Sequence, residues 1–361
     1  MPATHTPYLL LDLDAVTRAY DRLAGALPGV TLHYAVKCNA DPRVLRRLRD
    51  LGCRFEIASA AELALLRRMR VEPRDVLFSN PVKAWEHVRG AHAVGVHRFA
   101  VDSVGELDKI AAHAPGAAVY VRLGTAGSGQ VPSEGKFGVD VAAARSLLCG
   151  AAARGLTPYG VTFHVGSQTT DPTAWDAAIQ HSAQVMTDLL EDGIRLHMLD
   201  IGGGFPAAYV AYTPRPSDFG KHIRTALDRY LPYPVDLVAE PGRALVAEAG
   251  TMVSTVIGVA ERLGRRWVHL DVGAFNGMME ALESRNRLRY PVSDSRSSAT
   301  LTPYHLTGPS CDSQDTVLHD APLSDTIATG DTVYIHSAGA YTTGYASRFN
   351  GFDVPATVVA P

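Results

Sequence analysis

The chain has 361 residues and a formal net charge of −3, from 34 Lys and Arg against 37 Asp and Glu. This length exceeds that of one small domain and suits a barrel with an added module. The charge balance gives no reason to expect nucleic acid or an anionic membrane as a partner, and no apolar run approaches the ~18 residues that span a bilayer.

Short apolar runs alternate with helix-period segments from about residue 30 to residue 240 and predict the strands of a parallel sheet. Eight such units is the number that closes a barrel. An open doubly wound sheet is the alternative, but no G-x-G-x-x-G sequence follows the first run. The predicted strands are Leu32–Val36, Arg54–Ala58, Val76–Phe78, Arg98–Val101, Val119–Leu123, Gly160–His164, Met198–Ile201 and Leu237–Ala239.

Two of the predicted helices have clear starting signals. Asp41 is a suitable N-cap, Pro42 follows it in the first turn, and Gly52 stops the helix. The residues from Ser59 to Glu62 are typical of a capping box, which opens the next helix.

Beyond about residue 250 no long helical face separates the apolar runs, so we expect a β domain there. A strand over Tyr8–Leu13 is expected to join this domain rather than the barrel. The predicted fold is a (β/α)8 barrel over residues 28–250, with residues 1–27 and 251–361 forming the second domain. The other predicted strands of that domain are Val253–Ala260, Trp267–Val272, Thr300–Leu306 and Thr332–Ser337.

Cysteine spacing and the N-terminal sequence predict the cellular compartment. The four cysteines show no CxxC spacing, which argues against a zinc site and against a disulfide framework. The segment from Met1 to Pro7 lacks the basic and apolar regions of a secretory signal. We therefore expect a cytoplasmic protein without a bound metal.

Polar side chains stand at the carboxyl ends of the predicted barrel strands, where barrel enzymes place their reacting groups. Lys37 follows apolar residues, and desolvation would lower its pKa and free an amine for a Schiff base. A lysine that snorkels to the surface is the structural alternative. Glu240 could keep a pyridine nitrogen protonated, whereas an ion pair with Arg243 is its simpler explanation. The full set is Lys37, Glu56, Asn80, Asp102, Arg122, His164, the glycines at 202–204 and Glu240.

Glycine-rich turns follow the last two predicted strands, at Gly202-Gly203-Gly204 and at Gly242-Arg243. Glycine lets backbone N–H groups close on an anion, and the loops after strands seven and eight are the usual phosphate site of a barrel. A flexible loop would explain a triple glycine by itself. The two turns together indicate a phosphate that belongs to a substrate or a cofactor.

Six motifs occur along the chain, beginning at Tyr34 (YAVKCN), Phe163 (FHVGS), Gly202 (GGG), Glu240 (EPGR), Gly308 (GPSCD) and Gly339 (GAYT). With these motifs in this order, the chain resembles the fold-type III pyridoxal-phosphate decarboxylases, the group of ornithine decarboxylase, from about residue 7 to the C-terminus. The resemblance implies the alanine racemase-like fold, in which a C-terminal β-sandwich or β-barrel domain joins the barrel. It also implies pyridoxal 5'-phosphate as cofactor and amino-acid decarboxylation as reaction.

The resemblance also implies roles for the matching residues. Lys37 would bind the cofactor as a Schiff base, His164 would stack on its ring, and Glu240 would pair with the ring nitrogen. Glu56 matches an acidic position near the ring. Glu62 matches one near cofactor and substrate, although the capping box explains it equally well. The phosphate would be held by Ser167, Gly203, Gly204, Gly242, Arg243 and Tyr341.

Cys311 and Asp312 resemble a loop that, in this family, reaches into the neighbouring subunit's active site. The resemblance implies a homodimer with shared active sites, in which Cys311 would steer the return of a proton after carbon dioxide leaves. The residues alone favour a small buried hydrophobic side chain for Cys311. Asp312 from one subunit and Asp271 from the other would bind the distal ammonium of a basic L-amino acid, ornithine or lysine.

Diaminopimelate decarboxylases resemble the chain in most of these motifs. They carry glutamate at the position of Asp312 and an arginine near that of Met279, so we favour a substrate without a second carboxylate. A solvated side chain is expected for Glu280. Pro132 stands where eukaryotic-type ornithine decarboxylases have an active-site arginine. Lysine, arginine and modified or D-configured amino acids therefore stay open beside ornithine.

Two other classes of function share this fold. Racemases of the alanine racemase type pair the ring nitrogen with arginine, so Glu240 favours a decarboxylase. An inactive regulator of the antizyme-inhibitor type would have lost cofactor-binding residues, whereas this chain retains Lys37, Arg243 and Cys311.

Overall fold

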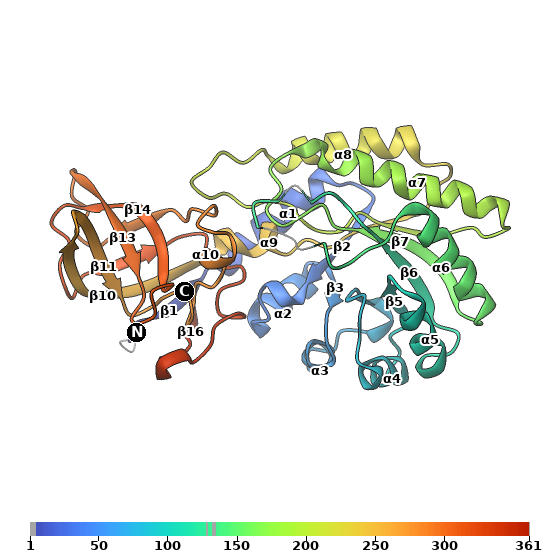
Figure 1. Cartoon of the computed structure of the whole chain (residues 1–361), viewed down its shortest axis with the longest axis horizontal. Coiled ribbons are helices and arrows are strands. Elements are labelled where there is room, and N and C mark those ends of the chain that lie inside the picture. The colour runs from blue at the N-terminus through green and yellow to red at the C-terminus, as the bar shows by residue number, and fades with distance from the viewer. Residues whose placement is uncertain (1–4, 128, 132–134, 361) are drawn as a thin grey trace.

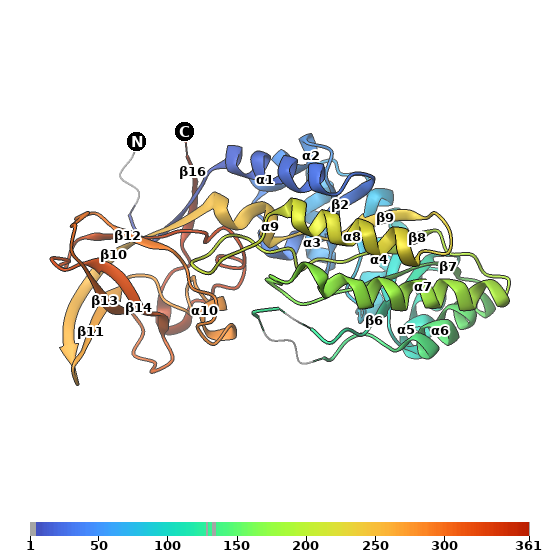
Figure 2. The ribbon, with the colours of Figure 1, turned by 90° about the horizontal axis from the view of Figure 1, so that it is seen from above.

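The computed structural model describes residues 5–127, 129–131 and 135–360. It has two lobes, a helix-covered barrel and a β domain, with both chain termini on the side of the β domain (Figure 1). The view from above shows the same two lobes side by side along the long axis (Figure 2).

All eight predicted barrel strands are confirmed, and they form a closed barrel in sequence order. The last strand pairs in parallel with the first, with Val30 opposite Leu237, so the barrel has no free strand edge. The barrel strands are β2 (Val30–Ala35), β3 (Arg54–Ile57), β4 (Val76–Phe78), β5 (Arg98–Val101), β6 (Ala118–Leu123), β7 (Thr157–Phe163), β8 (Met198–Asp200) and β9 (Asp236–Ala239).

The side chains of the barrel strands divide between the interior and the helices. One buried cluster, Leu77, Ala100, Tyr120, Met198 and Val238, comes from five different barrel strands and is separate from the main core. Their chain neighbours Phe78 and Phe99 belong to the larger core cluster. Because successive strand residues point to opposite faces, the smaller cluster fills the barrel interior.

The predicted helix starts are confirmed. The Asp41 carboxylate accepts from the N–H of Arg43 at 2.8 Å. Ser59 accepts from the N–H of Glu62 at 3.3 Å, while the Glu62 carboxylate reaches back to the N–H of Ala58 at 2.6 Å. The helices are α1 (Leu13–Ala26), α2 (Pro42–Asp50), α3 (Ala60–Arg68), α4 (Trp85–Ala93), α5 (Val104–His113), α6 (Val141–Ala153), α7 (Asp176–Glu191), α8 (Pro216–Tyr230), α9 (Arg243–Val246) and α10 (Glu280–Glu283).

The β domain is a mixed sheet in which most neighbours are antiparallel. The predicted N-terminal strand joins it, because β1 pairs with both β10 and β16. Three of its strands, β12, β14 and β16, were not predicted from the sequence. The strands are β1 (Tyr8–Leu11), β10 (Gly250–Arg262), β11 (Arg265–Leu270), β12 (Val292–Asp294), β13 (Leu301–Thr307), β14 (Thr316–Ser324), β15 (Thr332–Ile335) and β16 (Ala356–Val359).

The predicted boundary between residues 27 and 28 stays a prediction. Helix α1 packs against α2 and α8, which belong to the outer layer of the barrel. We therefore propose to count α1 with the barrel and only β1 with the β domain.

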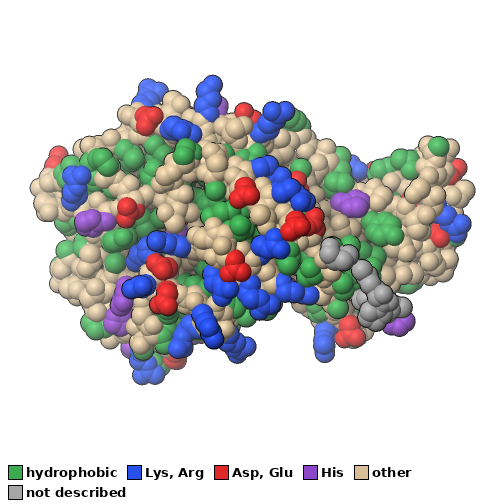
Figure 3. Space-filling view, turned by 180° about the vertical axis from the view of Figure 1, so that it is seen from behind, with side chains coloured by type: hydrophobic (Ala, Val, Ile, Leu, Met, Phe, Trp, Pro, Cys, Tyr) green, Lys and Arg blue, Asp and Glu red, His purple; other side chains and the backbone are tan. Residues whose placement is uncertain are grey.

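Charges of both signs share one face of the molecule. On the face turned away from the viewer of Figure 1, Lys and Arg side chains are numerous, and Asp and Glu side chains lie among them (Figure 3). Within the described part of the chain, no helix is long and apolar enough to cross a membrane, and no group of three or more His, Cys, Asp or Glu could hold a metal ion.

Candidate active site

One pocket at the carboxyl ends of the barrel strands collects most of the residues that the sequence singled out. They come from the loops after β2, β7, β8 and β9 and from the segment that follows β15 in the β domain. Gln168 and Phe205, which the sequence did not single out, also line it. The predicted residues in its lining are Lys37, His164, Ser167, Gly203, Gly204, Glu240, Gly242, Arg243 and Tyr341.

Lys37 lies in the single 3-10 turn, Val36–Cys38, that follows β2 directly. Its Nζ is 3.3 Å from one carboxylate oxygen of Glu56 and 3.5 Å from the other. The lysine side chain is 49% exposed to the mouth of the barrel, whereas the Glu56 side chain is 2% exposed. The structure thus places Glu56 beside the amine.

The prediction of a lowered pKa for Lys37 is wrong. Burial acts to lower the pKa of Lys37, but the carboxylates of Glu56 and Glu240 outweigh it and hold the pKa above its usual value. Burial raises the pKa of Glu56 to about 7, against the opposing charge of Lys37. The lysine is therefore an ammonium whose ion-pair partner is Glu56.

The glycine turns bring the backbone close to the pocket. A Cβ atom at Gly203 would lie 2.6 Å from the carbonyl oxygen of Glu240, and one at Gly242 would lie 2.9 Å from the Cβ of Cys38. Within the described residues, the N–H groups of Gly203, Gly204 and Gly242 donate to no protein acceptor. Such unpaired donors in a tight turn are a cradle for an anion.

Arg243 begins α9 at the edge of this cradle and is almost fully buried. It forms a two-point ion pair with Glu280, one contact of which is 2.7 Å, and it donates to the Tyr209 hydroxyl at 2.8 Å. The expectation that Glu280 is solvated is therefore wrong, because its side chain is 3% exposed. The ion pair of Glu240 with Arg243, which was the simpler alternative for Glu240, does not form, because Arg243 pairs with Glu280 instead.

Tyr341 completes this side of the pocket. Its φ of 52° is in the left-handed region, which non-glycine residues rarely adopt. The backbone N–H of Tyr341 donates to the carbonyl of Cys38 at 2.9 Å, and its ring lies 5.0 Å from the guanidinium carbon of Arg243. These contacts hold the tyrosine beside the glycine cradle.

His164 follows β7 and is electrically neutral. Burial, helped by the positive charges of Arg122 and Lys37, lowers the pKa of His164 to about 3. A neutral imidazole can lie against a cationic ring without charge repulsion. Arg122, at the end of β6, adds a positive charge to which the sequence had given no role.

Glu240 follows β9 and faces other polar groups in the barrel mouth. The hydroxyl of Ser79 donates to its Oε1 atom, and the Ser79 hydroxyl lies 2.8 Å from that of Tyr120. Burial and the nearby Asp200 raise the pKa of Glu240 to about 8. The sequence analysis missed Ser79, Tyr120 and Asp200, although Ser79 and Asp200 stand at strand ends, where polar residues were otherwise collected.

Five predicted site residues do not line this pocket: Glu56, Asp271, Cys311, Asp312 and Glu62. Of these, Glu56 still lies 3.3 Å from the Nζ atom of Lys37. Asp271 accepts from the Ser254 hydroxyl at 2.6 Å and from the Thr255 N–H at 3.0 Å, both in β10. Cys311 is exposed, and Asp312 accepts from the N–H of a residue in its own loop. Glu62 caps α3, as described above. Pro132 lies outside the described residues.

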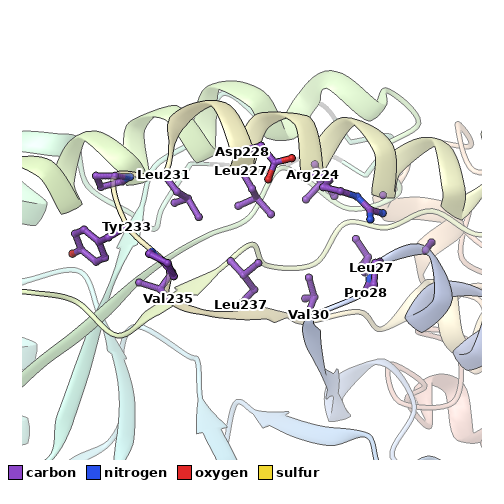
Figure 4. A pocket seen from close by; sticks show the side chains of 15 residues that line it. Leu27, Pro28, Val30, Arg224, Leu227, Asp228, Leu231, Tyr233, Val235 and Leu237 are labelled. Atoms are coloured by element: carbon purple, nitrogen blue, oxygen red, sulfur yellow. The ribbon is translucent and has the colours of Figure 1, made fainter.

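A separate groove of about 510 Å³ lies at the opposite end of the barrel, between α8 and the beginnings of β2 and β9 (Figure 4). Leu27, Leu227 and Leu237 are among its apolar lining residues. The lining, all of it in the described chain, contains no Lys, His or Cys. Its charged lining residues are Arg224 and Asp228, and this described lining offers no amine for a Schiff base, so we place the chemistry at the Lys37 end.

The residues at the Lys37 end fit pyridoxal phosphate. An amine, a carboxyl group that can hold a proton, and unpaired N–H donors with a guanidinium beside them occupy one pocket. They match the aldehyde, the pyridine nitrogen and the phosphate of this cofactor, respectively.

Comparisons with known proteins agree with this fit. The family described as "Pyridoxal-dependent decarboxylase, pyridoxal binding domain" matches residues 13–247. The chain is 33% identical over 359 residues to the lysine/ornithine decarboxylase of Selenomonas ruminantium, covering 98% of this chain and 89% of that protein. It is 33% identical over 365 residues to the ornithine decarboxylase of Schizosaccharomyces pombe, covering 97% of this chain and 82% of that protein.

A solved structure of a decarboxylase is also similar to this chain over nearly its whole length. The lysine/ornithine decarboxylase from Vibrio vulnificus, complexed with cadaverine, superposes with a TM-score of 0.90 at 36% identity, covering 98% of this chain and 94% of that one. With the family matched over the whole barrel and relatives aligned over nearly the whole chain, this protein belongs to the pyridoxal-dependent decarboxylases and uses pyridoxal phosphate as its cofactor.

Proposed function

We propose that the protein decarboxylates a basic L-amino acid, ornithine or lysine, to the corresponding diamine. The observation that carries the proposal is the meeting of Lys37, Glu240 and the glycine cradle in one pocket. The relatives with these names are about a third identical over nearly the full chain. The Vibrio vulnificus enzyme has been crystallised with cadaverine and with putrescine.

Each pocket residue then has a task that its environment supports. The cofactor, when bound, accepts the electron pair left on Cα after carbon dioxide departs. Lys37 supplies the amine that holds the cofactor, and Glu240 holds a proton at the pyridine nitrogen. Neutral His164 covers the ring face. The phosphate is bound by Ser167, Gly203, Gly204, Gly242, Arg243 and Tyr341.

We propose a homodimer in which the partner completes each site. Cys311 and Asp312 do not line the Lys37 pocket of their own chain. Cys311 is exposed, as a residue that enters a neighbouring site must be. In this arrangement Cys311 delivers the proton to Cα, and Asp312 pairs with the distal ammonium. Sedimentation of the pure protein tests the dimer.

The proposal also gives substrate-binding roles to Asp271 and Glu62. The Asp271 carboxylate already accepts two hydrogen bonds from β10, so it would bind a substrate ammonium with its remaining acceptor capacity. The Glu62 carboxylate already accepts a hydrogen bond from the backbone N–H of Ala58.

A substrate panel tests the proposal directly. Carbon dioxide release should be ranked for L-ornithine, L-lysine, L-arginine, meso-diaminopimelate and D-ornithine. We expect ornithine or lysine to be preferred, because the negative charges of Asp271 and Asp312 would repel a second carboxylate on the substrate. A clear preference for diaminopimelate would reject the assignment of Asp271 and Asp312. Lys37→Ala should abolish turnover and serves as the inactive control in the carbon dioxide assay.

Two competing functions remain testable with the same preparation. The antizyme inhibitor 2 of Xenopus laevis is 31% identical over 362 residues. An inactive regulator would lack the ~420 nm absorbance band of the bound cofactor that borohydride bleaches. A racemase would interconvert enantiomers faster than it releases carbon dioxide. The retained Lys37 and Glu240 favour the decarboxylase over both.

We also propose a cytoplasmic location. All four cysteines are unpaired thiols, and a disulfide-free protein with an exposed thiol suits a reducing compartment.

A further inference from the structure

A buried carboxylate lies beside the loop that carries Cys311 and Asp312. Asp315 follows this loop directly and is 1% exposed. Its Oδ2 atom accepts hydrogen bonds from the N–H of Ser310 at 3.0 Å and from the Ser310 hydroxyl at 2.6 Å. Its Oδ1 atom accepts from the N–H of Ala274 at 2.7 Å. The carboxylate therefore joins the loop to the segment that follows β11.

The backbone of Asp315 closes the same loop. Its carbonyl oxygen accepts from the N–H of Gly308 at 2.8 Å and from the Thr307 hydroxyl. Its own N–H donates to the carbonyl oxygen of Asp312 at 3.1 Å. Cys311 and Asp312 thus lie in a loop that Asp315 fastens at its beginning and at its end.

Two glycines leave space for this carboxylate and for no other side chain. A Cβ atom at Gly273 would overlap with Oδ1 of Asp315, and one at Gly308 would overlap with Oδ2. Gly273 belongs to the segment that follows Asp271, whereas Gly308 begins the loop that contains Cys311. The carboxylate is therefore packed at one position between these two segments.

Hydrogen bonds alone stabilise the charge of Asp315. Within the described residues it forms no salt bridge. A buried carboxylate needs donors to replace its lost hydration, and the three N–H and O–H groups around Asp315 supply them. Because a carboxylate oxygen only accepts, an asparagine here would place its N–H group against another donor. The surroundings are therefore specific for aspartate.

The functional side chains of the loop depend on its backbone for their position. Cys311 is exposed, and its Sγ atom accepts from Asn350 at 3.4 Å. The Asp312 carboxylate accepts from the N–H of Gln314, which belongs to the same loop. Neither contact reaches a strand of the β domain. The loop backbone, and with it Asp315, therefore sets where these side chains stand.

We propose that Asp315 is a positioning residue for catalysis: its carboxylate holds the loop from residue 308 to residue 315 in one conformation, in which Cys311 and Asp312 enter the partner's active site. This inference rests on the proposed function and extends it to a residue that contacts neither substrate nor cofactor. Asp315 acts through the loop. Because the loop serves the neighbouring site, loss of Asp315 impairs catalysis in the other subunit.

Hydrogen exchange of the cofactor-free protein tests the anchoring without turnover. In Asp315→Asn the peptide over residues 306–315 should exchange its amides roughly 10-fold faster than in the wild type, because buried donors lose their acceptor. Asp294→Asn is the matched control. Asp294 also accepts from the N–H and the hydroxyl of one serine, Ser324, but lies outside the loop. Wild-type exchange of this peptide in Asp315→Asn overturns the proposal.

Steady-state kinetics measure the consequence for catalysis. A displacement of about 1 Å can reduce the rate 10²-fold, so Asp315→Asn should lower kcat/KM by about 10- to 100-fold while the cofactor absorbance persists. Asp294→Asn should lower the Tm without this loss. Ser310→Ala keeps the carboxylate and removes one of its three hydrogen bonds, so its loss should be smaller. An unchanged kcat/KM in Asp315→Asn, or an equal loss in Asp294→Asn, overturns the proposal.

Mixed dimers show whether Asp315 acts in the partner's site. A dimer of one Lys37→Ala subunit and one Asp315→Asn subunit has one site with an intact lysine and an intact loop. Random mixing should therefore restore about a quarter of the wild-type activity. A mixture of Lys37→Ala with Cys311→Ala is the reference for a shared site. Recovery in the reference but not with Asp315→Asn overturns this inference alone, whereas no recovery in either mixture rejects the shared sites of the proposed function and the inference with them.

Discussion

The ion pair between Arg243 and Glu280 joins the two lobes and provides a sharp test of the structure. Arg243 lies in α9 after the last barrel strand, and Glu280 lies in α10 after β11 of the β domain. Their side chains are 4% and 3% exposed. Glu280→Ala therefore leaves a guanidinium buried with the Tyr209 hydroxyl as its remaining side-chain partner.

Breaking one side of a buried ion pair costs about 3–5 kcal/mol. At about 2–4 °C per kcal/mol for domains of 150–250 residues, the Tm of the cofactor-free protein should fall by roughly 6 °C or more. Calorimetry should also show less cooperative unfolding, because the lost contact lies between the lobes. Inorganic phosphate should restore part of the loss, because Arg243 lines the anion cradle.

Glu280→Gln is the matched control, because it keeps the shape and one acceptor but removes the charge. We expect its Tm to lie between those of the wild type and Glu280→Ala. A Glu280→Ala protein whose Tm stays within about 1 °C of the wild type would refute the reasoning, since 1 kcal/mol should already be visible.

Three further outcomes follow from the site. In the folded protein the pKa of Glu240 is about 8, above the ordinary value for glutamate. The contribution of Glu240 to the free energy of unfolding is therefore complete below that ordinary pKa and is lost as the pH rises from there through about 8. The Tm of the cofactor-free protein should therefore fall more steeply across this window than that of Glu240→Gln. Gly203→Ala places a Cβ 2.6 Å from a backbone oxygen and should reduce cofactor affinity measured by absorbance, whereas Gly105→Ala, with open space around it, should not. Asp312→Ala should raise KM and lower kcat/KM in a carbon dioxide assay while the cofactor absorbance persists.

Each of these outcomes can fail separately. Parallel Tm profiles for the wild type and Glu240→Gln would mean that Glu240 is ionised throughout the window. Unchanged affinity in Gly203→Ala would show that the turn can shift without loss of the cradle. Loss of cofactor in Asp312→Ala would place this residue in the cofactor site rather than in substrate binding.

The sequence predicted the barrel well because its signals are local. The barrel strands are short apolar runs followed by helices, and some of these helices begin with a side-chain cap, as at Asp41 and Ser59. The β domain was predicted less completely. Strand β16 is defined by its parallel pairing with β1, more than 340 residues earlier, which no local pattern encodes. Strand β12 has three residues of which only Val292 is apolar, whereas the equally short β4 is an entirely apolar run that the sequence shows.

The sequence by itself determined which chemical groups the pocket contains, because an amine, a carboxyl group and glycine turns at strand ends meet whenever a parallel barrel closes. Only the tertiary structure decided how these groups interact. Lys37 has a raised rather than a lowered pKa, because Glu56 and Glu240 come from other strands. Glu280 pairs with Arg243 across the two lobes, and Asp200 stands behind Glu240. Charge interactions depend on distance through space, and that distance is fixed only when segments remote in the chain pack together.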